Sequence, residues 1–274
     1  MRSKPTNPSF AHKKSLGQNF LTSPVVPSLM CTAGRVEAGD RVLEIGPGTG
    51  ALTKTLLALG AKVTAIETDD RAIAILNETF AAEITAHQLV IIAADIRHTP
   101  IPSVFDTTLP YKVIANIPYY LSGYLLRLVL ELDTPPQLIV FLMQKEVVHR
   151  ITRDKKSSLL SLSVAVYGTA SYVKTISRGH FSPPPQVDSA ILLIDHIHKT
   201  NLPTPPDRER FFDHLHLGLG HKRKQLLGAL AEKFDRSSLE QLFAELNLKP
   251  TVRGEDLSIV EWLALSKKLH QLGS

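Results

Sequence analysis

Residues 116–120 read N-I-P-Y-Y and combine hydrogen-bond acceptors with aromatic rings. One chemistry that such groups could support is the transfer of a methyl group to the amino group of adenine. That amino group is a poor nucleophile, because its lone pair is delocalised into the ring. Two acceptors on its two hydrogens favour the tetrahedral form, in which the localised lone pair can attack a methyl group. Asn116 can offer its side-chain oxygen for this purpose, and Ile117 can offer its backbone carbonyl.

The next two residues suit the same chemistry. Pro118 biases Ile117 toward extended conformations and so fixes the direction of that carbonyl. Tyr119 offers an aromatic face on which a base flipped out of its stack can lie. Catalysis would rest on positioning and charge stabilisation, so no general base with a shifted pKa is required. The alternative is a strand end and a turn with two buried tyrosines.

A glycine-rich turn precedes this motif: residues 44–50 read E-I-G-P-G-T-G, between a predicted strand and a predicted helix. Open α/β sheets bind ligands at such turns, and glycines let the backbone approach a ligand closely. Glu67 and Asp95 end the next two predicted strands, and Glu67 is placed to accept hydrogen bonds from two ribose hydroxyls. A nicotinamide-dependent oxidoreductase fits this pattern too, as does a turn selected only for packing.

The elements that must position these residues alternate from about residue 41 to residue 196. The predicted strands are 41–46, 61–67, 89–95, 112–117, 138–143 and 189–195, and the predicted helices are 48–59, 69–80 and 121–132. Alternation implies crossover connections, and therefore a mainly parallel sheet with helices on both faces.

A second part of the chain follows. Residues 200–206 are rich in proline and lack periodicity, which predicts a linker. Beyond it the pattern predicts only helices, at about 207–219, 222–233, 237–246 and 256–270. We therefore expect two domains, residues 1–200 and residues 201–274.

The composition is that of an ordinary globular protein: 274 residues, 43% apolar and 21% charged. It argues against a disordered, collagen-like or disulfide-stapled chain. The apolar run Leu138–Met143 is far shorter than the roughly 20 residues of a membrane span. No secretory signal is visible, and a single Cys31 cannot form an internal disulfide. We expect a cytoplasmic protein that does not enter a membrane.

The formal net charge of +5 is unevenly distributed. Residues 1–20 contain basic but no acidic side chains, residues 41–110 contain more acidic than basic ones, and residues 145–156 are mainly basic. This pattern predicts a site for a small cationic or hydroxylated ligand beside a surface for a polyanion. Solvated faces that simply differ in charge are the alternative.

The motifs favour one cofactor. E-x-G-P-G-T-G, followed by an acidic strand end and by A-D-I at residues 94–96, resembles the motif set of S-adenosylmethionine-dependent methyltransferases. That cofactor carries a positively charged sulfonium and no pyrophosphate, which suits the acidic block. N-I-P-Y resembles the N-[LI]-P-[YF] motif of amino-group methyltransferases that act on adenine.

Four features occur in order: K-K-S-L-G-Q-N-F-L at residues 13–21, the glycine turn, N-I-P-Y-Y, and F-S-P-P-P-Q-V-D-S at residues 181–189. Over about residues 10–270 the chain resembles the ribosomal RNA adenine N6,N6-dimethyltransferases, most closely the bacterial 16S group. The resemblance implies a Rossmann-like methyltransferase sheet with a small all-helical C-terminal domain. It also implies two methyl transfers to each of two adjacent adenines in a hairpin loop of small-subunit RNA.

The same resemblance implies the site residues. The cofactor would be held by Asn19, Leu21, Gly46, Gly48, Glu67, Asp95 and Asn116. Glu67 would bind its ribose and Asp95 its adenine, while Asn19 and Leu21 close the pocket. The catalytic group would be Asn116, Ile117, Pro118, Tyr119 and Phe181, with Tyr119 and Phe181 on the two faces of the target base. A purely structural packing role for Phe181 stays open.

The basic segments would contact RNA phosphates, with affinity that falls steeply with salt. The predicted residues are Lys13, Lys14, Lys145, Arg150, Arg153, Lys155, Lys156, Lys222 and Arg223. The run 221–224 could equally be a solvated helix face, and K-K-S-L departs from the basic-plus-aromatic form common in the family. The histidines show no metal-ligand spacing, so we predict no metal.

The expected partner is 16S ribosomal RNA in a small-subunit assembly particle, bound by a monomer. Two rival functions remain. One is a 23S ribosomal RNA adenine methyltransferase of the macrolide-resistance type, and the other is a non-catalytic ribosome-assembly or RNA-binding factor. A pure binding protein has no need of Asn116, which argues against the second.

Overall fold

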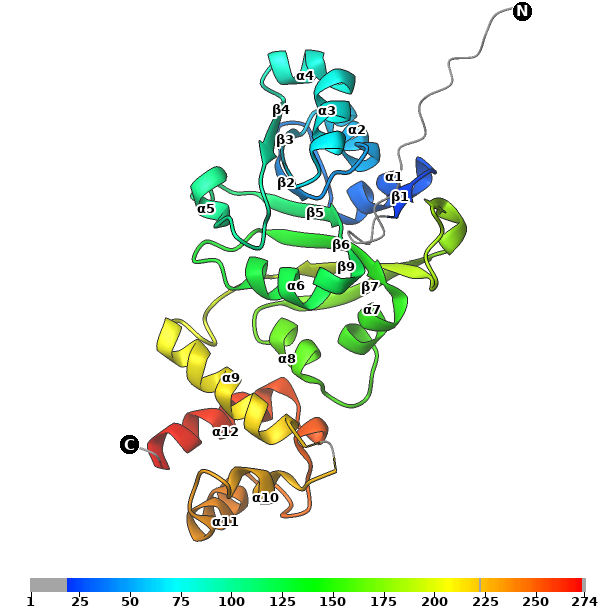
Figure 1. Ribbon diagram of the computed structural model, residues 1–274. Helices are drawn as coiled ribbons and strands as arrows, with labels where there is room; N and C mark the ends of the chain where they lie inside the picture. The colour runs from blue at the N-terminus through cyan, green and yellow to red at the C-terminus, as the bar shows by residue number, and fades with distance from the viewer. Residues whose placement is uncertain (1–18, 222, 273–274) are drawn as a thin grey trace, which may run out of the picture.

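The computed structural model describes residues 19–221 and 223–272, and within them seven strands form one mixed sheet (Figure 1). The strand order is β4-β3-β2-β5-β6-β9-β7. The parallel strands are β2 (Arg41–Ile45), β3 (Lys62–Glu67), β4 (Leu89–Ala93), β5 (Lys112–Asn116) and β6 (Leu138–Gln144). β9 (Ser189–Asp195) runs antiparallel to both β6 and β7 (Thr169–Ile176).

The sheet is buried on both faces, which explains the nearly continuous apolar runs of its central strands. Successive residues of a strand point to opposite faces. In β5, Val113 and Ala115 join one core cluster, whereas Ile114 joins the other. In β6, Phe141 and Val140 divide between the clusters in the same way. The predicted sheet with two covered faces is confirmed.

Helices cover both faces. One core cluster includes buried residues of α1 (Val25–Ala33), α2 (Ala51–Ala58) and α3 (Asp70–Thr79). The other cluster includes buried residues of α6 (Ser122–Leu130) and α8 (Leu159–Ala165). The remaining helices of this part are α4 (Ala81–Thr85), α5 (Ile101–Val104) and α7 (Lys145–Thr152), with short 3₁₀ turns η2 (Tyr119–Leu121) and η3 (Arg178–His180).

Several of these elements are missing from the sequence-based prediction. Strand β7 lies at an edge of the sheet, and most of its residues are exposed or half-buried, so it carries no apolar run. Helix α1 has a proline in its first turns, and α7 and α8 are short. Local pattern alone is weak for elements of these kinds.

The chain after β9 is helical, as predicted: α9 (Pro205–Leu219), α10 (Leu226–Leu230), α11 (Arg236–Glu245) and α12 (Ile259–Leu272), with the 3₁₀ turn η4 (Gly254–Asp256). The prediction of a linker through residue 206 is wrong at its end. Thr204 caps α9, and two prolines occupy the first turn of the helix, where a missing N–H costs nothing.

The helical part packs directly on the sheet part. Phe211 and Phe212 of α9 belong to the same core cluster as Val164 of α8 and Leu192 of β9. Trp262 of α12 is fully buried, and its indole N–H donates a hydrogen bond to the carbonyl oxygen of Gly254, 3.0 Å away. The apolar core therefore continues across residue 200, and the division into two domains there stays a prediction.

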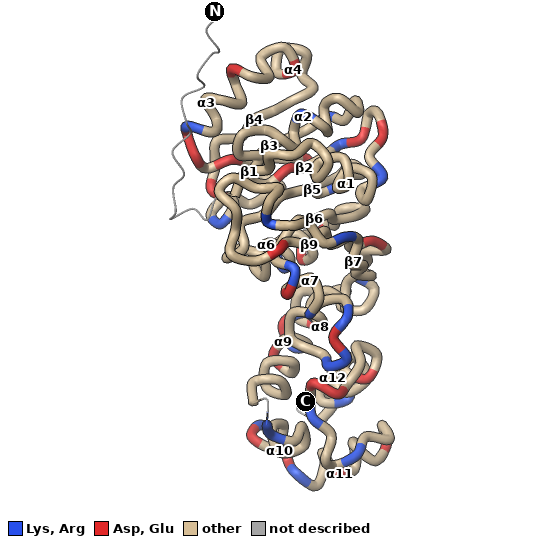
Figure 2. The backbone as a smooth tube through the Cα atoms, turned by 90° about the vertical axis from the view of Figure 1, so that its right-hand side faces the viewer, with Lys and Arg blue, Asp and Glu red and all other residues tan. Residues whose placement is uncertain are grey.

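In Figure 2 the helices α9 to α12 extend the molecule beyond the edge of the sheet, and basic and acidic segments alternate along that part. Among the described helices, none combines the length and the apolar character that crossing a membrane requires.

Candidate active site

A cavity lies at the carboxyl ends of β2, β3 and β5, and it brings together segments that are far apart in the sequence. Its lining includes Asn19, Phe20, Leu21, Glu44, Gly46, Gly48, Glu67, Asp95, Arg97, Asn116, Ile117, Pro118, Tyr119 and Tyr120. Every residue predicted to bind the cofactor is in this lining. So are four of the five predicted catalytic residues, the exception being Phe181.

The glycine turn forms one wall, with φ of +68° at Gly46, +58° at Gly48 and +83° at Gly50. L residues rarely adopt such angles. A Cβ at Gly48 would lie 2.7 Å from the ring of Phe20, so the glycine lets the N-terminal segment approach the turn. A Cβ at Gly46 would meet no atom of the described residues within 4 Å, which leaves open space beside that backbone.

Backbone groups hold the carboxylate of Glu67, which is buried at the end of β3. Its Oε2 accepts a hydrogen bond from the amide N–H of Gly48 at 3.0 Å. Its Oε1 accepts from the N–H groups of Thr68 and Asp69, at 2.8 and 2.9 Å. A carboxylate offers about four acceptor sites, so Oε2 keeps room for a ligand hydroxyl.

Glu44, at the end of β2, is a second acidic residue of this wall and is absent from the predicted set. It is 1% exposed, and the hydroxyl of Thr53 donates a hydrogen bond to its Oε2 at 2.7 Å. Burial raises its pKa from 4.5 to about 8, and the nearby charge of Glu67 acts in the same direction. In the sequence, the feature that could have identified Glu44 is its place as the first residue of the E-x-G-P-G-T-G motif.

These two carboxyl groups fit a positively charged, hydroxylated ligand. An opposite charge close to a buried carboxyl stabilises its ionised form. Glu67 can receive hydroxyls at Oε2, and the space beside Gly46 admits a ligand close to the backbone. The residues of the cavity therefore suit S-adenosylmethionine better than a pyrophosphate ligand.

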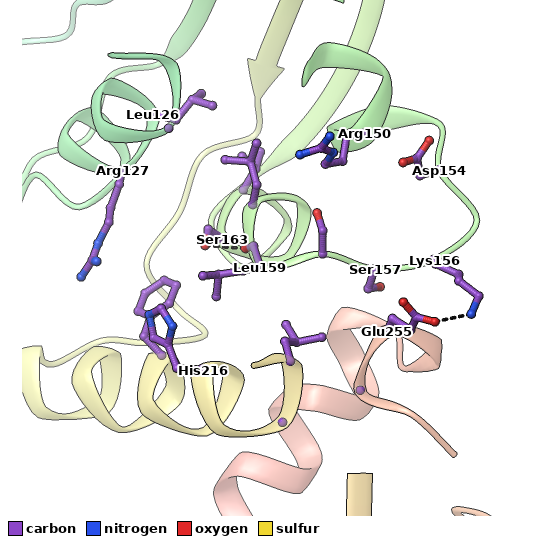
Figure 3. A pocket seen from close by; sticks show the side chains of 18 of the residues that line it. Leu126, Arg127, Arg150, Asp154, Lys156, Ser157, Leu159, Ser163, His216 and Glu255 are labelled. Carbon is purple, nitrogen blue, oxygen red and sulfur yellow. Dashed lines mark hydrogen bonds and ion pairs between the residues drawn. The ribbon is translucent and has the colours of Figure 1, made fainter. Parts of the chain in front are cut away.

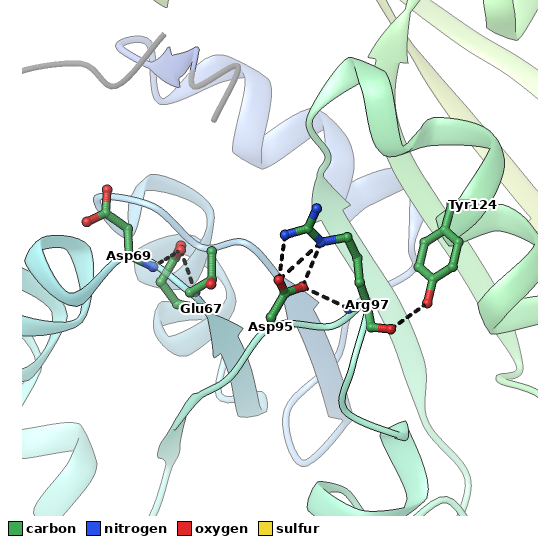
Figure 4. A network of polar contacts seen from close by, with 6 residues as sticks. Glu67, Asp69, Asp95, Arg97 and Tyr124 are labelled. Atoms are coloured by element: carbon green, nitrogen blue, oxygen red, sulfur yellow. Dashed lines mark hydrogen bonds and ion pairs between the residues drawn. The ribbon is translucent and has the colours of Figure 1, made fainter. Parts of the chain in front are cut away.

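The carboxylate of Asp95 is held by Arg97 (Figure 4). The guanidinium of Arg97 lies 2.6 Å from Asp95 Oδ2, and the Arg97 amide N–H donates to Oδ1 at 2.9 Å. These hydrogen bonds lower the pKa of Asp95 to about 2, so it remains ionised at neutral pH. Tyr124, on the other side of Arg97, donates a hydrogen bond from its hydroxyl to the Arg97 carbonyl oxygen at 3.3 Å.

Asn116 ends β5 and contacts the N-terminal segment. Its side-chain nitrogen donates a hydrogen bond to the carbonyl oxygen of Asn19 at 3.2 Å. In this orientation the amide oxygen is directed away from Asn19 and can act as an acceptor. Pro118, with φ of −58° and ψ of +133°, then leads into the turn η2, which carries Tyr119.

Tyr119 is anchored by a residue of β9 at the same edge of the sheet. Its hydroxyl and that of Ser189 lie 2.7 Å apart, and Ser189 is fully buried at the start of β9. Burial raises the pKa of Tyr119, so the phenol stays protonated at neutral pH. Ser189 is absent from the predicted set, although it is the last residue of the F-S-P-P-P-Q-V-D-S segment.

Phe181 lies in the core and not in the cavity lining. It is 4% exposed and belongs to β8 (Phe181–Ser182), which pairs with β1 (Phe20–Leu21) so that Phe181 is opposite Leu21. The structure thus places Phe181 where it packs beneath the N-terminal segment. Its role as the second face of a base sandwich stays a prediction.

The predicted RNA-binding residues that the structure describes are all exposed, and several have partners. Lys145 begins α7. Arg150 forms an ion pair with Glu146 at 3.3 Å, and the guanidinium of Arg153 lies 3.8 Å from the ring centre of Tyr172. Lys156 pairs with Glu255 and Asp256, which partly neutralise it. Lys155 and Arg223 are exposed, while Lys13, Lys14 and Lys222 lie outside the described residues.

A second cavity, of about 640 Å³, is lined by residues of α6 and α8 on one side and of α9 and η4 on the other (Figure 3). Its lining contains basic side chains from both parts of the chain, among them Arg150, Lys156, Lys224 and Arg253, but also the acidic Glu131 and Glu255. The predicted contacts of Arg150 and Lys156 with RNA would lie at its rim.

Over residues 19–221 and 223–272, no cluster of three or more His, Cys, Asp or Glu side chains could hold a metal ion. The absence of a metal in the working protein stays a prediction.

Comparison with known proteins agrees with this geometry. Residues 9–271 match the family model described as ribosomal RNA adenine dimethylase. A ribosomal RNA small subunit methyltransferase A from Dehalococcoides mccartyi is 36% identical, and the match covers 92% of this chain and 87% of that protein. A protein of the same name from Lactococcus lactis is 37% identical, with coverage of 96% and 92%.

Two solved structures share the fold. A dimethyladenosine transferase from Plasmodium falciparum aligns with a TM-score of 0.79 and 24% identity, over 93% of this chain and 98% of that one. The 23S rRNA methyltransferase ErmE aligns with a TM-score of 0.72 and 23% identity, over 92% and 100%. Because the family model matches residues 9–271, nearly the whole length of the chain, the chain belongs to the ribosomal RNA adenine dimethylase family.

Proposed function

We propose that this protein transfers methyl groups from S-adenosylmethionine to N6 of two adjacent adenines in a hairpin loop of 16S ribosomal RNA. The products are N6,N6-dimethyladenosines, formed during ribosome biogenesis. The observation that carries the proposal is that the acceptor motif Asn116–Tyr119 and the glycine turn with Glu67 open into one cavity. The name shared by the curated relatives supports the small-subunit RNA as substrate.

The cofactor would supply a methyl group bonded to its positive sulfonium sulfur: the bond from sulfur to carbon would break as the bond from carbon to N6 forms, and N6 would release one proton to solvent. Glu67 would bind a ribose hydroxyl through Oε2, and the ionised Asp95 would accept a hydrogen bond from the cofactor adenine. Gly46 and Gly48 let backbone approach the ligand, and Asn19 and Leu21 close the cavity from the N-terminal side.

The chain's own residues prepare the attacking amino group. The amide oxygen of Asn116 and the carbonyl oxygen of Ile117 would accept its two hydrogens, so that its lone pair is localised on nitrogen. Tyr119, fixed by Ser189, would support the face of the flipped base. Fixed acceptors that cost no rearrangement lower the barrier for such a step.

The same proposal includes the contacts with RNA phosphates, the natural substrate particle and the cytoplasmic location. Exposed cations of α7 and the following loop, Lys145, Arg150, Arg153 and Lys155, would contact phosphates near the cavity. The natural substrate would be a small-subunit assembly particle, and the protein would act on it as a cytoplasmic monomer. The similarity in fold to ErmE does not favour 23S RNA as the substrate, because a similarity at 23% sequence identity shows a shared fold alone.

The test is to incubate purified small-subunit and large-subunit particles that lack the modification with the protein and labelled cofactor. Methylated adenines are then mapped by primer extension. We expect label at two adjacent adenines of 16S RNA, and label confined to large-subunit RNA would refute the proposal. Binding of a nicotinamide dinucleotide in preference to S-adenosylmethionine would refute the cofactor assignment.

A further inference from the structure

Two exposed tyrosines flank the entrance to the cavity. Tyr120 follows Tyr119 in the turn η2, lines the cavity and is 57% exposed. Tyr124, in the first turn of α6, is 42% exposed. Single exposed aromatic side chains are ordinary, but Tyr120 lines the cavity and Tyr124 contacts Arg97, which lines it too.

Arg97 joins these tyrosines to the active site. Its guanidinium is fixed on Asp95, yet the side chain is 49% exposed and also lines the cavity. The hydrogen bonds to Asp95 raise the pKa of Arg97. The Tyr124 hydroxyl lies 3.3 Å from the Arg97 carbonyl oxygen, and Tyr120 lines the same cavity as Arg97. Figure 4 shows Arg97 between Asp95 and Tyr124.

We propose that Arg97, Tyr120 and Tyr124 form a flanking-base platform, which binds the nucleotide next to the target adenine in the single-stranded loop. This inference rests on the proposed function. Unstacked RNA bases are held on tyrosine rings and on the planes of arginine side chains, and the guanidinium also attracts phosphate. A guanidinium already held by a carboxylate needs little further ordering to take part.

The position of the platform sets its role. Tyr119 and Tyr120 are consecutive and both line the cavity, so a nucleotide next to a target base on Tyr119 would lie within reach of Tyr120. Phe181 is buried beneath β1, whereas Tyr120 and Tyr124 are exposed aromatic side chains of the described part of the chain. The platform therefore selects an unpaired neighbour for the target adenine.

The experiment uses a synthetic small-subunit hairpin with 2-aminopurine at the nucleotide beside the target, together with unmodified particles for kinetics. The variants are Tyr120→Ala, Tyr124→Ala and both together, with Tyr120→Phe and Tyr124→Phe to keep the rings. Leu109→Ala is the matched control, because Leu109 is 53% exposed but precedes β5 at the opposite end of the sheet.

In the wild type we expect 2-aminopurine fluorescence to be quenched by stacking on binding. The double alanine variant should lose that quenching and show a KM for RNA about tenfold higher, the scale expected for a lost stacking contact. Its kcat and its affinity for S-adenosylmethionine should change little. The phenylalanine variants and Leu109→Ala should behave as the wild type.

Unchanged quenching and KM in the double alanine variant would overturn the inference. So would phenylalanine variants as impaired as alanine ones, because that result assigns the effect to the hydroxyls. A defect seen with whole particles but not with the hairpin would instead indicate a ribosomal protein as the partner. A wild type that does not methylate small-subunit RNA refutes the proposed function, whereas normal methylation with unaffected alanine variants refutes the platform alone.

Discussion

The two sides of the cavity are built differently. The cofactor wall, made of the glycine turn with Glu44 and Glu67, is buried and is fixed largely by backbone N–H groups. The proposed RNA wall, made of Tyr119, Tyr120 and Tyr124, presents side chains that are half-buried or exposed. A small, constant ligand can be enclosed by backbone, whereas an RNA loop must be approached by side chains on an open surface.

Asn116 lies where the two walls meet, and its removal should have the largest effect. We expect Asn116→Ala to lower kcat by about 10²–10³-fold, as for other lost fixed groups that stabilise a transition state, while RNA binding is nearly unchanged. Methylation rates and gel-shift titrations on the same particles measure the two quantities. Asn77→Ala, an exposed asparagine of α3, is the control; equal loss of binding and rate would contradict the assigned role.

Substitution of Gly48 tests how closely Phe20 must approach the glycine turn for the cofactor to bind. Gly48→Ala places a Cβ 2.7 Å from the ring of Phe20 and at a φ of +58°, so that ring must move away from the turn. We expect affinity for S-adenosylmethionine to fall by at least about tenfold, measured by calorimetry; misplaced contacts of this size cost about 1–3 kcal/mol.

Gly39→Ala is the control that separates the effect of backbone strain at a positive φ from the effect of the contact with Phe20. Gly39 also has a positive φ, +88°, but no described atom lies within 4 Å of the Cβ that the substitution would add. This variant should lose stability and keep its cofactor affinity. If both alanine variants weaken the cofactor equally, the approach of Phe20 to the turn is not important for binding.

Glu44 makes the cofactor wall sensitive to pH. In the unfolded chain this carboxyl ionises near 4.5, whereas burial keeps it protonated in the folded protein up to about pH 8. The folded state then holds the extra proton, so its contribution lowers the free energy of unfolding as pH rises between those values, by up to about 1.4 kcal/mol per pH unit.

Glu44→Gln keeps the shape and removes the titration. Denaturant unfolding at several pH values from 5 to 8 should show a flatter profile for the variant than for the wild type. Parallel profiles would indicate that Glu44 is ionised in the folded protein across this range.

The smallest effect concerns the RNA wall. Loss of the Tyr119–Ser189 hydrogen bond by Ser189→Ala should lower kcat about fivefold, the scale of one hydrogen bond of about 1 kcal/mol. Tyr119→Phe should do the same, and the double variant should be no worse than either single one. Additive losses would mean that Ser189 acts independently of Tyr119, and Ser189→Thr should restore part of the rate.

The cofactor wall was easier to predict from the sequence than the RNA wall. Strands buried on both faces are continuous apolar runs, and a polar residue such as Glu67 or Asn116 at the end of such a run is easily recognised. The contact of Tyr119 with Ser189 joins residues 70 positions apart, which no local pattern records. The edge strand β7 is too polar to stand out, and the burial of Phe181 depends on its pairing with β1.

That pairing also makes closure of the cavity depend on a segment about 160 positions further along the chain. β1 closes the cavity with two residues, Phe20 and Leu21, whose pairing with β8 is separate from the seven-stranded sheet. Because the partner of β1 lies outside that sheet, a substitution near residue 181 can disturb the closed cavity without changing the strand order of the sheet.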